Sequence, residues 1–74
     1  KGQFDLIIIN ILANSINKIV NDVNILTKRN SYVILSGIKK SQQAKVITKW
    51  NKFNFIPLKI FSYGNWVTLI LIKN

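Results

Sequence analysis

The sequence predicts an α/β fold in which short strands alternate with helices, in the order β-α-β-α-β-β. Three observations support this order: two short β-branched runs, two segments whose apolar residues are spaced by three and four, and a Gly-Asn pair between two further apolar runs. With 74 residues, the chain can form one domain at most, and half of a larger domain is equally compatible with its length.

The first strand is predicted over residues 5–10, a continuous apolar run typical of a strand buried on both faces of a parallel sheet. A helix follows, capped by Asn14 or Ser15. Residues 28–30 are predicted to end this helix, with Asn30 in the left-handed conformation. The apolar face of the helix consists of Ile16, Ile19, Val20, Val23 and Leu26.

The second β-α unit is predicted to begin with a buried strand over residues 32–36, followed by a sharp turn at Gly37. Lys39 and Lys40 are expected to form a solvated turn, and Ser41 is the predicted cap of the second helix. Residues 51–54 end that helix. Its predicted apolar positions are Ala44, Val46, Ile47 and Trp50, with Trp50 and Phe53 as packing residues.

Two strands are predicted at the end of the chain, over residues 55–63 and 66–72, and the Gly64-Asn65 pair suits a tight hairpin between them. Successive β-α-β units have right-handed crossovers, so both helices should cover the same face of the sheet. The hairpin is expected to add antiparallel strands. Nothing in the chain would then cover the opposite face, which includes Ile8 and Ile34, and the first strand would be an open edge. These features predict a truncated domain.

The composition excludes several kinds of chemistry. The chain has no cysteine and no histidine, and its only acids are Asp5 and Asp22. It therefore offers no zinc site and no carboxylate pair for general acid–base catalysis. The longest apolar runs are far below the ~20 residues of a spanning helix, and no signal peptide is recognisable, so a cytoplasmic protein without a membrane partner is expected.

The net charge of +9 raises the question of an anionic partner. However, the cations are spread along the sequence, which favours solvated faces over one binding stripe. Isoleucine, asparagine and lysine, with 14, 10 and 10 residues, are amino acids of A/T-rich codons, so base composition also accounts for basicity. Nucleic acid is therefore not expected as the primary partner.

Three motifs carry a resemblance to a known family. Residues 4–13, FDLIIINILA, resemble the D-x-apolar-N-I-L-A stretch of the PrmA-type methyltransferases, which modify large-subunit ribosomal protein eleven. Residues 35–38, LSGI, match the end of that family's next strand, and Gln42 or Gln43 followed by Val46 continues the match. Residues 64–69, GNWVTL, resemble its last strand. The resemblance covers nearly the whole chain.

The resemblance implies a class I S-adenosylmethionine-dependent methyltransferase. That family has a Rossmann-like sheet of seven strands, the last antiparallel and inserted between its two predecessors. Residues 1–74 would be the C-terminal portion of this catalytic domain, supplying strands four to seven, and the cofactor-binding N-terminal half would be absent. No G-x-G-x-x-G motif can be written from the chain's three glycines.

The resemblance also implies site residues. Asn10 corresponds to the asparagine that ends strand four and contacts S-adenosylmethionine, although an isolated asparagine there can also be a cap or turn residue. Ile11 and Leu12 stand where relatives with N-P-P-[YF] clamp a flat substrate, which favours a lysine side chain or an N-terminal amine instead. Trp66 lies near the substrate side by analogy, but a tryptophan in a strand is more often a core residue, and the core is the favoured interpretation.

No catalytic residue is expected, because alignment of the amine with the methyl group supplies most of the rate effect. The expected function is a fragment of a protein N-methyltransferase acting on lysine or α-amino groups of large-subunit ribosomal protein eleven, inactive alone. Two alternatives remain: a non-catalytic degenerate remnant, and a small basic module that binds RNA or the ribosome.

Overall fold

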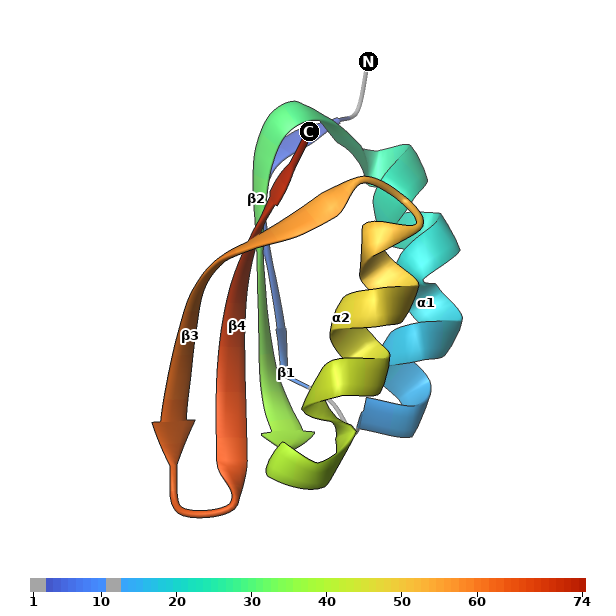
Figure 1. The fold of residues 1–74 in the computed structure, drawn as a ribbon. Helices are drawn as coiled ribbons and strands as arrows, with labels where there is room; N and C mark the ends of the chain where they lie inside the picture. The colour runs from blue at the N-terminus through green and yellow to red at the C-terminus, as the bar shows by residue number, and fades with distance from the viewer. Residues whose placement is uncertain (1–2, 11–12) are drawn as a thin grey trace.

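The computed structural model describes residues 3–10 and 13–74, and over these it shows one four-stranded sheet with two α-helices packed on the same face (Figure 1). The predicted order of elements is confirmed. In chain order they are β1 (Phe4–Asn10), α1 (Ala13–Leu26), β2 (Thr27–Lys39), a 3-10 turn (Lys40–Gln42), α2 (Gln43–Asn51), β3 (Phe55–Tyr63) and β4 (Trp66–Lys73). Neither α-helix in this described part is long and apolar enough to cross a membrane.

The strand order across the sheet is β1-β2-β4-β3, so the last strand is inserted between its two predecessors. β1 pairs with β2 in parallel, and β4 pairs with both β2 and β3 in antiparallel fashion. β3 therefore runs in the same direction as β1 and β2. The crossover through α2 returns the chain to the same end of the sheet, so the hairpin contributes its antiparallel pairing through β4, the last strand, as expected.

The core lies between the helices and one face of the sheet. Alternate residues of β2 and β4 point into it, as a period of two requires. Trp50 at the end of α2 and Phe55 at the start of β3 are both fully buried, which confirms that Trp50 is a packing residue, and Phe53 packs against the core as a partly buried side chain. The other buried apolar residues are Ile16, Val20, Val23, Val33, Leu35, Ile38, Val46, Val67, Leu69 and Leu71.

The opposite face of the sheet is apolar and uncovered in the described residues. Leu6 is 50% exposed, Ile8 66% and Tyr32 43%. β1 is also an edge strand, as expected. The prediction that β1 is buried on both faces is wrong for this structure, since the helices cover only one of the two faces that its apolar run presents.

The end of α1 differs from the prediction. The helix stops at Leu26, so residues 28–30 lie in β2 instead of closing the helix. The Thr27 hydroxyl donates to the Val23 carbonyl at 2.8 Å, which satisfies one of the last carbonyls of the helix. Asn30 does have a positive φ of 73°, but it lies near the start of β2 and does not close the helix.

The start of α2 also differs. Ser41 lies inside the 3-10 turn, and Gln42 occupies the N-cap position without a side-chain hydrogen bond. Ala44 is exposed and not part of the apolar face, because it precedes Val46 by two residues and therefore lies on the opposite side of the helix from the buried Val46. The prediction for Gly64 is confirmed, since it has a φ of 58° in the hairpin turn. Gly37 has a φ of 81°, but the predicted turn there is wrong: β2 continues to Lys39, and Gly37 lies where the register with β4 shifts.

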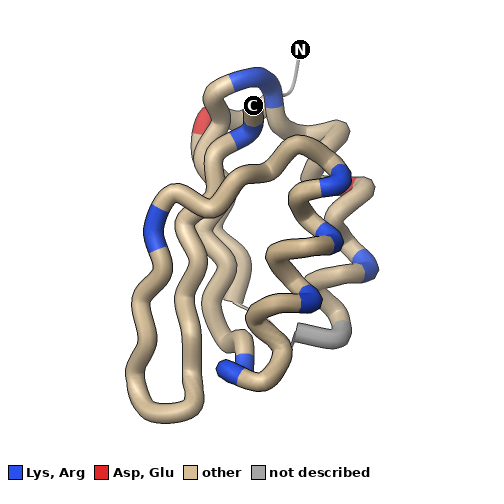
Figure 2. Tube along the Cα trace, in the orientation of Figure 1, with Lys and Arg blue, Asp and Glu red and all other residues tan. Residues whose placement is uncertain are grey.

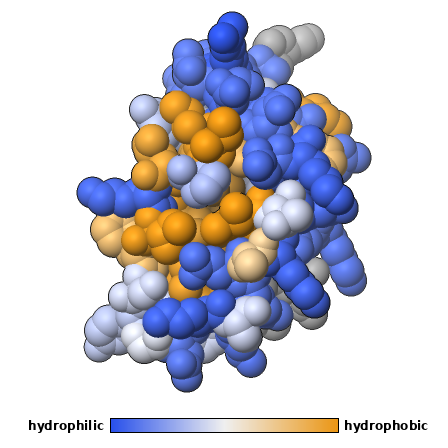
Figure 3. Space-filling view, viewed as in Figure 1, coloured by the Kyte–Doolittle hydropathy of each residue, from blue (hydrophilic) through white to orange (hydrophobic). Residues whose placement is uncertain are grey.

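The outer strand β3 is only partly covered by α2. In Figure 3, hydrophobic surface extends over the middle of the β3–β4 hairpin and toward α2. β3 contributes Leu58, 59% exposed, and Ile60, 43% exposed. The hairpin thus extends beyond the helical layer.

Candidate functional site

The carboxyl ends of β1, β2 and β3 meet at one edge of the sheet, where the arrowheads of β2 and β3 and the turn of the hairpin lie at the bottom of Figure 1. Ligands of open α/β sheets bind outside the carboxyl ends of the strands. This edge is therefore where functional side chains are expected to gather.

Asn10 is the last residue of β1 and has an exposed side chain at this edge. It pairs with Ser36 of β2, and alternation places it on the same uncovered face as Leu6 and Ile8. The Ser36 hydroxyl donates to the Ile9 carbonyl at 3.4 Å, so Ser36 is tied to the backbone of β1. The Asn10 amide is left pointing to the open face, where it can both donate and accept hydrogen bonds.

Trp66 does not belong to the core, so the favoured interpretation of this residue was wrong. The side chain is 47% exposed. The buried residues of β4 are Val67, Leu69 and Leu71, and alternation directs Trp66 to the uncovered face. Its place at the first position of β4 puts it at the same edge as Asn10, with β2 between the two strands.

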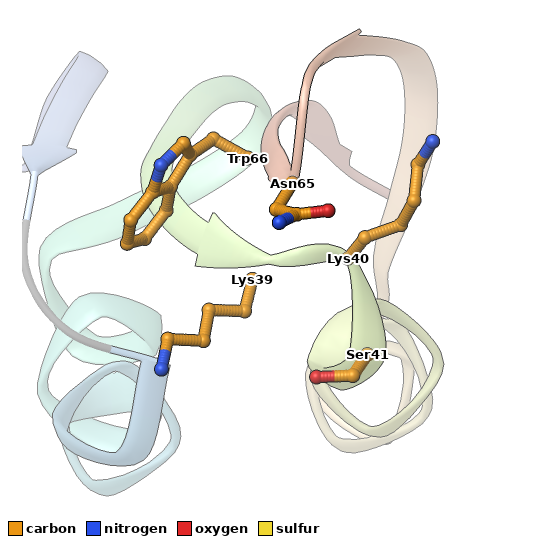
Figure 4. A pocket seen from close by; sticks show the side chains of 5 residues that line it. All are labelled: Lys39, Lys40, Ser41, Asn65 and Trp66. Atoms are coloured by element: carbon orange, nitrogen blue, oxygen red, sulfur yellow. The ribbon is translucent and has the colours of Figure 1, made fainter.

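A cavity of about 300 Å³ lies at this edge, between the end of β2, the 3-10 turn and the hairpin turn (Figure 4). The backbone N–H of Lys40 donates to the Asn65 carbonyl at 2.8 Å and holds the two turns together. The cavity is lined by Lys39, Lys40, Ser41, Asn65 and Trp66. The cavity could not be predicted from the sequence, in which Lys39 and Lys40 suggest only a solvated turn, because it exists only when β4 pairs with β2.

The cavity end of the molecule is basic. Lys39 and Lys40 lie at the carboxyl end of β2, whereas the acidic positions lie toward the opposite end of the structure (Figure 2). Asp5, near the start of β1, forms an ion pair with Lys28 at 2.9 Å. Among the described residues, no carboxylate faces the two lysines of the cavity. The local potential is therefore positive.

The structure thus brings Asn10 and Trp66, two of the four predicted site residues, to one face and one edge of the sheet. The other two, Ile11 and Leu12, lie outside the described residues. Lys39 of β2 belongs to this group because it pairs with Trp66 of β4. Register between separated strands cannot be read from local periodicity.

The fold matches a protein methylase of known structure. The crystal structure of ribosomal protein L11 methylase from Lactobacillus delbrueckii subsp. bulgaricus superposes on the whole of this chain with a TM-score of 0.93 and 27% sequence identity, over 38% of that protein. The chain is therefore an α/β unit of the methyltransferase class, corresponding to the C-terminal part of that methylase.

The family follows from the sequence comparisons. The profile of the ribosomal protein L11 methyltransferase (PrmA) family matches residues 1–74, so the chain belongs to this family. Ribosomal protein L11 methyltransferase of Thermotoga petrophila is 37% identical over 71 residues, 96% of this chain and 27% of the relative. That of Agrobacterium fabrum is 38% identical over 73 residues, 99% of this chain and 25% of the relative. The chain spans about a quarter of the length of these relatives, and the resemblance of the motifs is confirmed.

Proposed function

We propose that this chain is the C-terminal portion of the catalytic domain of an S-adenosylmethionine-dependent protein N-methyltransferase, equivalent to strands four to seven of a seven-stranded sheet. In this proposal a preceding segment supplies the cofactor-binding half, and the 74-residue chain is inactive alone. The proposed substrate is ribosomal protein L11, modified on lysine or α-amino groups in the cytoplasm. The relatives are named for this substrate.

The observation that carries the proposal is the uncovered side of β1. Its outer edge has no strand partner among the described residues, and its open face presents Leu6 and Ile8. An unpaired edge and an apolar face are both unfavourable in water, and a further strand with a covering helix would remove both. A preceding segment of this kind would complete the sheet beside Asn10.

The proposed cofactor contact is Asn10. S-adenosylmethionine supplies a methyl group on a sulfonium, and the amide of Asn10 fits its polar groups because it can donate and accept hydrogen bonds. The fit is limited to one edge of the cofactor: Gly37 lies in an irregular part of β2 and Gly64 in the hairpin turn, both with positive φ, and the chain contains no glycine-rich loop to cradle the rest. This division supports a cofactor site shared with a preceding half.

The proposed substrate contacts are Ile11, Leu12 and Trp66. The exposure of Trp66 supports its part in this set, since a core tryptophan would not reach a ligand. The Asn10 amide ends β1 and the Trp66 indole begins β4, with β2 between the two strands. In this proposal a flexible amine approaches between these two side chains. Positioning of that amine is the contribution expected of this chain.

A chimaera tests the proposal. The matching segment of Ribosomal protein L11 methyltransferase from Thermotoga petrophila is replaced by this chain, and transfer of labelled methyl groups to ribosomal protein L11 is measured. The chimaera is expected to methylate, and Asn10→Ala to raise the Kd of S-adenosylmethionine by roughly 10-fold, the effect of losing hydrogen bonds to a bound polar group. Asn21→Ala, an exposed asparagine on α1, is the matched control.

The isolated chain provides the complementary measurement. Titration calorimetry with S-adenosylmethionine is expected to show no saturable binding. Tight binding by the isolated chain would contradict the proposed sharing of the cofactor site, and a folded but inactive chimaera would contradict the enzymatic assignment and favour a degenerate remnant.

A further inference from the structure

The end of the β3–β4 hairpin exposes three aromatic side chains. Phe61 is 49% exposed, Tyr63 88% and Trp66 47%. Phe61 and Tyr63 are alternate residues of β3, and Tyr63 pairs directly with Trp66 across the hairpin. All three rings therefore lie on the uncovered face, next to one another.

Lysines lie beside these rings. Lys39 pairs with Trp66 from the β2 side, so that Tyr63, Trp66 and Lys39 form one row across three strands. Lys59 extends the β3 side of the surface, with its Nζ 5.7 Å from the centroid of the Phe61 ring. We call the group formed by Lys39, Lys59, Phe61, Tyr63 and Trp66 the hairpin surface.

The positive charge of the hairpin surface has no local counter-charge. The chain has two acids, of which Asp5 is paired with Lys28 near the amino end of β1, and Asp22 lies in the second half of α1. The carboxyl end of the sheet carries lysines without acids in the described structure (Figure 2). An anionic ligand would relieve the repulsion between these ammonium groups.

The cavity lined by Lys39, Lys40 and Trp66 adjoins one end of this surface. Its volume of about 300 Å³ is at the lower end of the range for small-molecule sites. Figure 4 shows the Lys39 side chain extending to the same side as the Trp66 indole, whereas the Lys40 side chain points away from both. An exposed indole with an ammonium group beside it suits a nucleotide, which combines a planar base with a phosphate.

We propose that the hairpin surface binds single-stranded RNA, with bases stacked on Tyr63 and Trp66 and phosphates held by Lys39 and Lys59. An acidic peptide would use the lysines but leave the exposed rings without a role, whereas unpaired bases use both. Double-stranded RNA would not present its base faces to the rings. The spread of the lysines along the sequence hides this site, because strand pairing gathers residues from β2, β3 and β4.

This inference concerns a second ligand that shares Trp66 with the proposed substrate contacts, but it does not depend on the cofactor or on methylation. RNA binding by the full chain requires only the hairpin and the end of β2. A failure of the chimaera to methylate would leave it intact, and a failure to bind RNA would leave the methyltransferase proposal intact.

The test is fluorescence anisotropy of a labelled single-stranded oligoadenylate titrated with the full chain. Trp66→Ala is expected to weaken binding roughly 10-fold, while Trp66→Phe retains most of the affinity because a phenyl ring still stacks. Lys39→Gln combined with Lys59→Gln should reduce the slope of log affinity against log salt by about 1.4, for two phosphate contacts. The RNA should also quench the emission of the exposed Trp66, since Trp50 is fully buried.

The matched control is Lys45→Gln combined with Lys49→Gln on α2, which removes the same charge from exposed positions away from the hairpin. This variant should keep the quenching and most of the affinity. Equal losses in the two double variants, equal affinity for an RNA duplex, displacement of the RNA by poly-glutamate with the same quenching, or no binding of the oligoadenylate would each overturn the proposal. Circular dichroism of every variant confirms that the fold is retained.

Discussion

The Trp50 indole meets the Phe55 ring edge to face, with the ring centroids 5.2 Å apart and the planes inclined by 64°. The contact joins the last turn of α2 to the first residue of β3, and both side chains are fully buried. Between them the chain reverses at Asn54, which has a φ of 69°. An aromatic pair of this kind contributes beyond its buried area, so it fixes how the helical layer is attached to the hairpin.

Replacement of Phe55 by alanine is expected to destabilise the fold by about 3–5 kcal/mol, since it leaves a cavity and removes the aromatic pair. A chain of this size has little more stability than that, so the cooperative unfolding transition should be lost. Urea titration followed by circular dichroism measures this. Tyr63→Ala, at an 88% exposed position, should change the free energy of unfolding by about 0.5 kcal/mol or less. Similar effects in the two variants would contradict the packing described.

Ser31 connects the first two strands. Its hydroxyl donates to the Phe4 carbonyl at 2.8 Å and accepts from the Lys28 backbone N–H at 2.9 Å, and the residue is almost completely buried. Ser31→Ala should cost about 1–3 kcal/mol, because two backbone groups lose their partner. Chemical denaturation with Ser62→Ala, an exposed position, as control checks this. A change no larger than that of the control would show that water replaces the hydroxyl at both groups.

Gly64 needs a left-handed backbone but has space around it. Its φ is 58°, and a Cβ added there would meet nothing within 4 Å. Gly64→Ala is therefore expected to cost about 1–2 kcal/mol from backbone strain alone, and Gly64→Asn less, since asparagine visits this conformation more readily. Thermal unfolding of both variants ranks them. An alanine variant at least as stable as the asparagine variant would argue against the positive φ.

Lys73 predicts a pH dependence of stability. Burial lowers the pKa of its ammonium below the usual 10.5, at a position where Nζ lies 4.8 Å from the centroid of the Phe55 ring. Between the lowered pKa and 10.5 the unfolded chain binds more protons than the folded chain, so the free energy of unfolding should rise with pH across that window. Lys73→Met should flatten the rise measured by urea unfolding, and the exposed control Lys49→Met should not.

Much of the fold could be predicted from the sequence because its signals are local. The β-branched runs, the helical spacing of the apolar residues and the Gly64-Asn65 turn gave every strand and both α-helices. The resemblance to the methyltransferase family added the position of β4 inside the sheet. The uncovered face followed from the handedness of β-α-β crossovers, and Ile8 at 66% exposure confirms it.

The errors concern features that depend on contacts between distant residues. Asn30 has the predicted left-handed backbone, but Thr27 ends α1 earlier by bonding to the Val23 carbonyl. The sequence favours a core position for Trp66, because an aromatic residue in a strand usually packs inward. Its exposure follows from alternation with Val67, and its lysine neighbour comes from pairing with β2. Asn10 is at the predicted strand end, whereas its role stays a prediction.

The position of β4 also constrains how this molecule can be assembled during translation. β3 is synthesised before β4, yet β4 is the strand that links it to β2. A nascent polypeptide that has left the ribosomal exit tunnel only as far as Tyr63 therefore holds β3 beside the growing sheet without a hydrogen-bonded neighbour. The sheet can be completed only after Trp66–Lys73 have emerged. Until then, chaperones can bind the apolar side chains of β3.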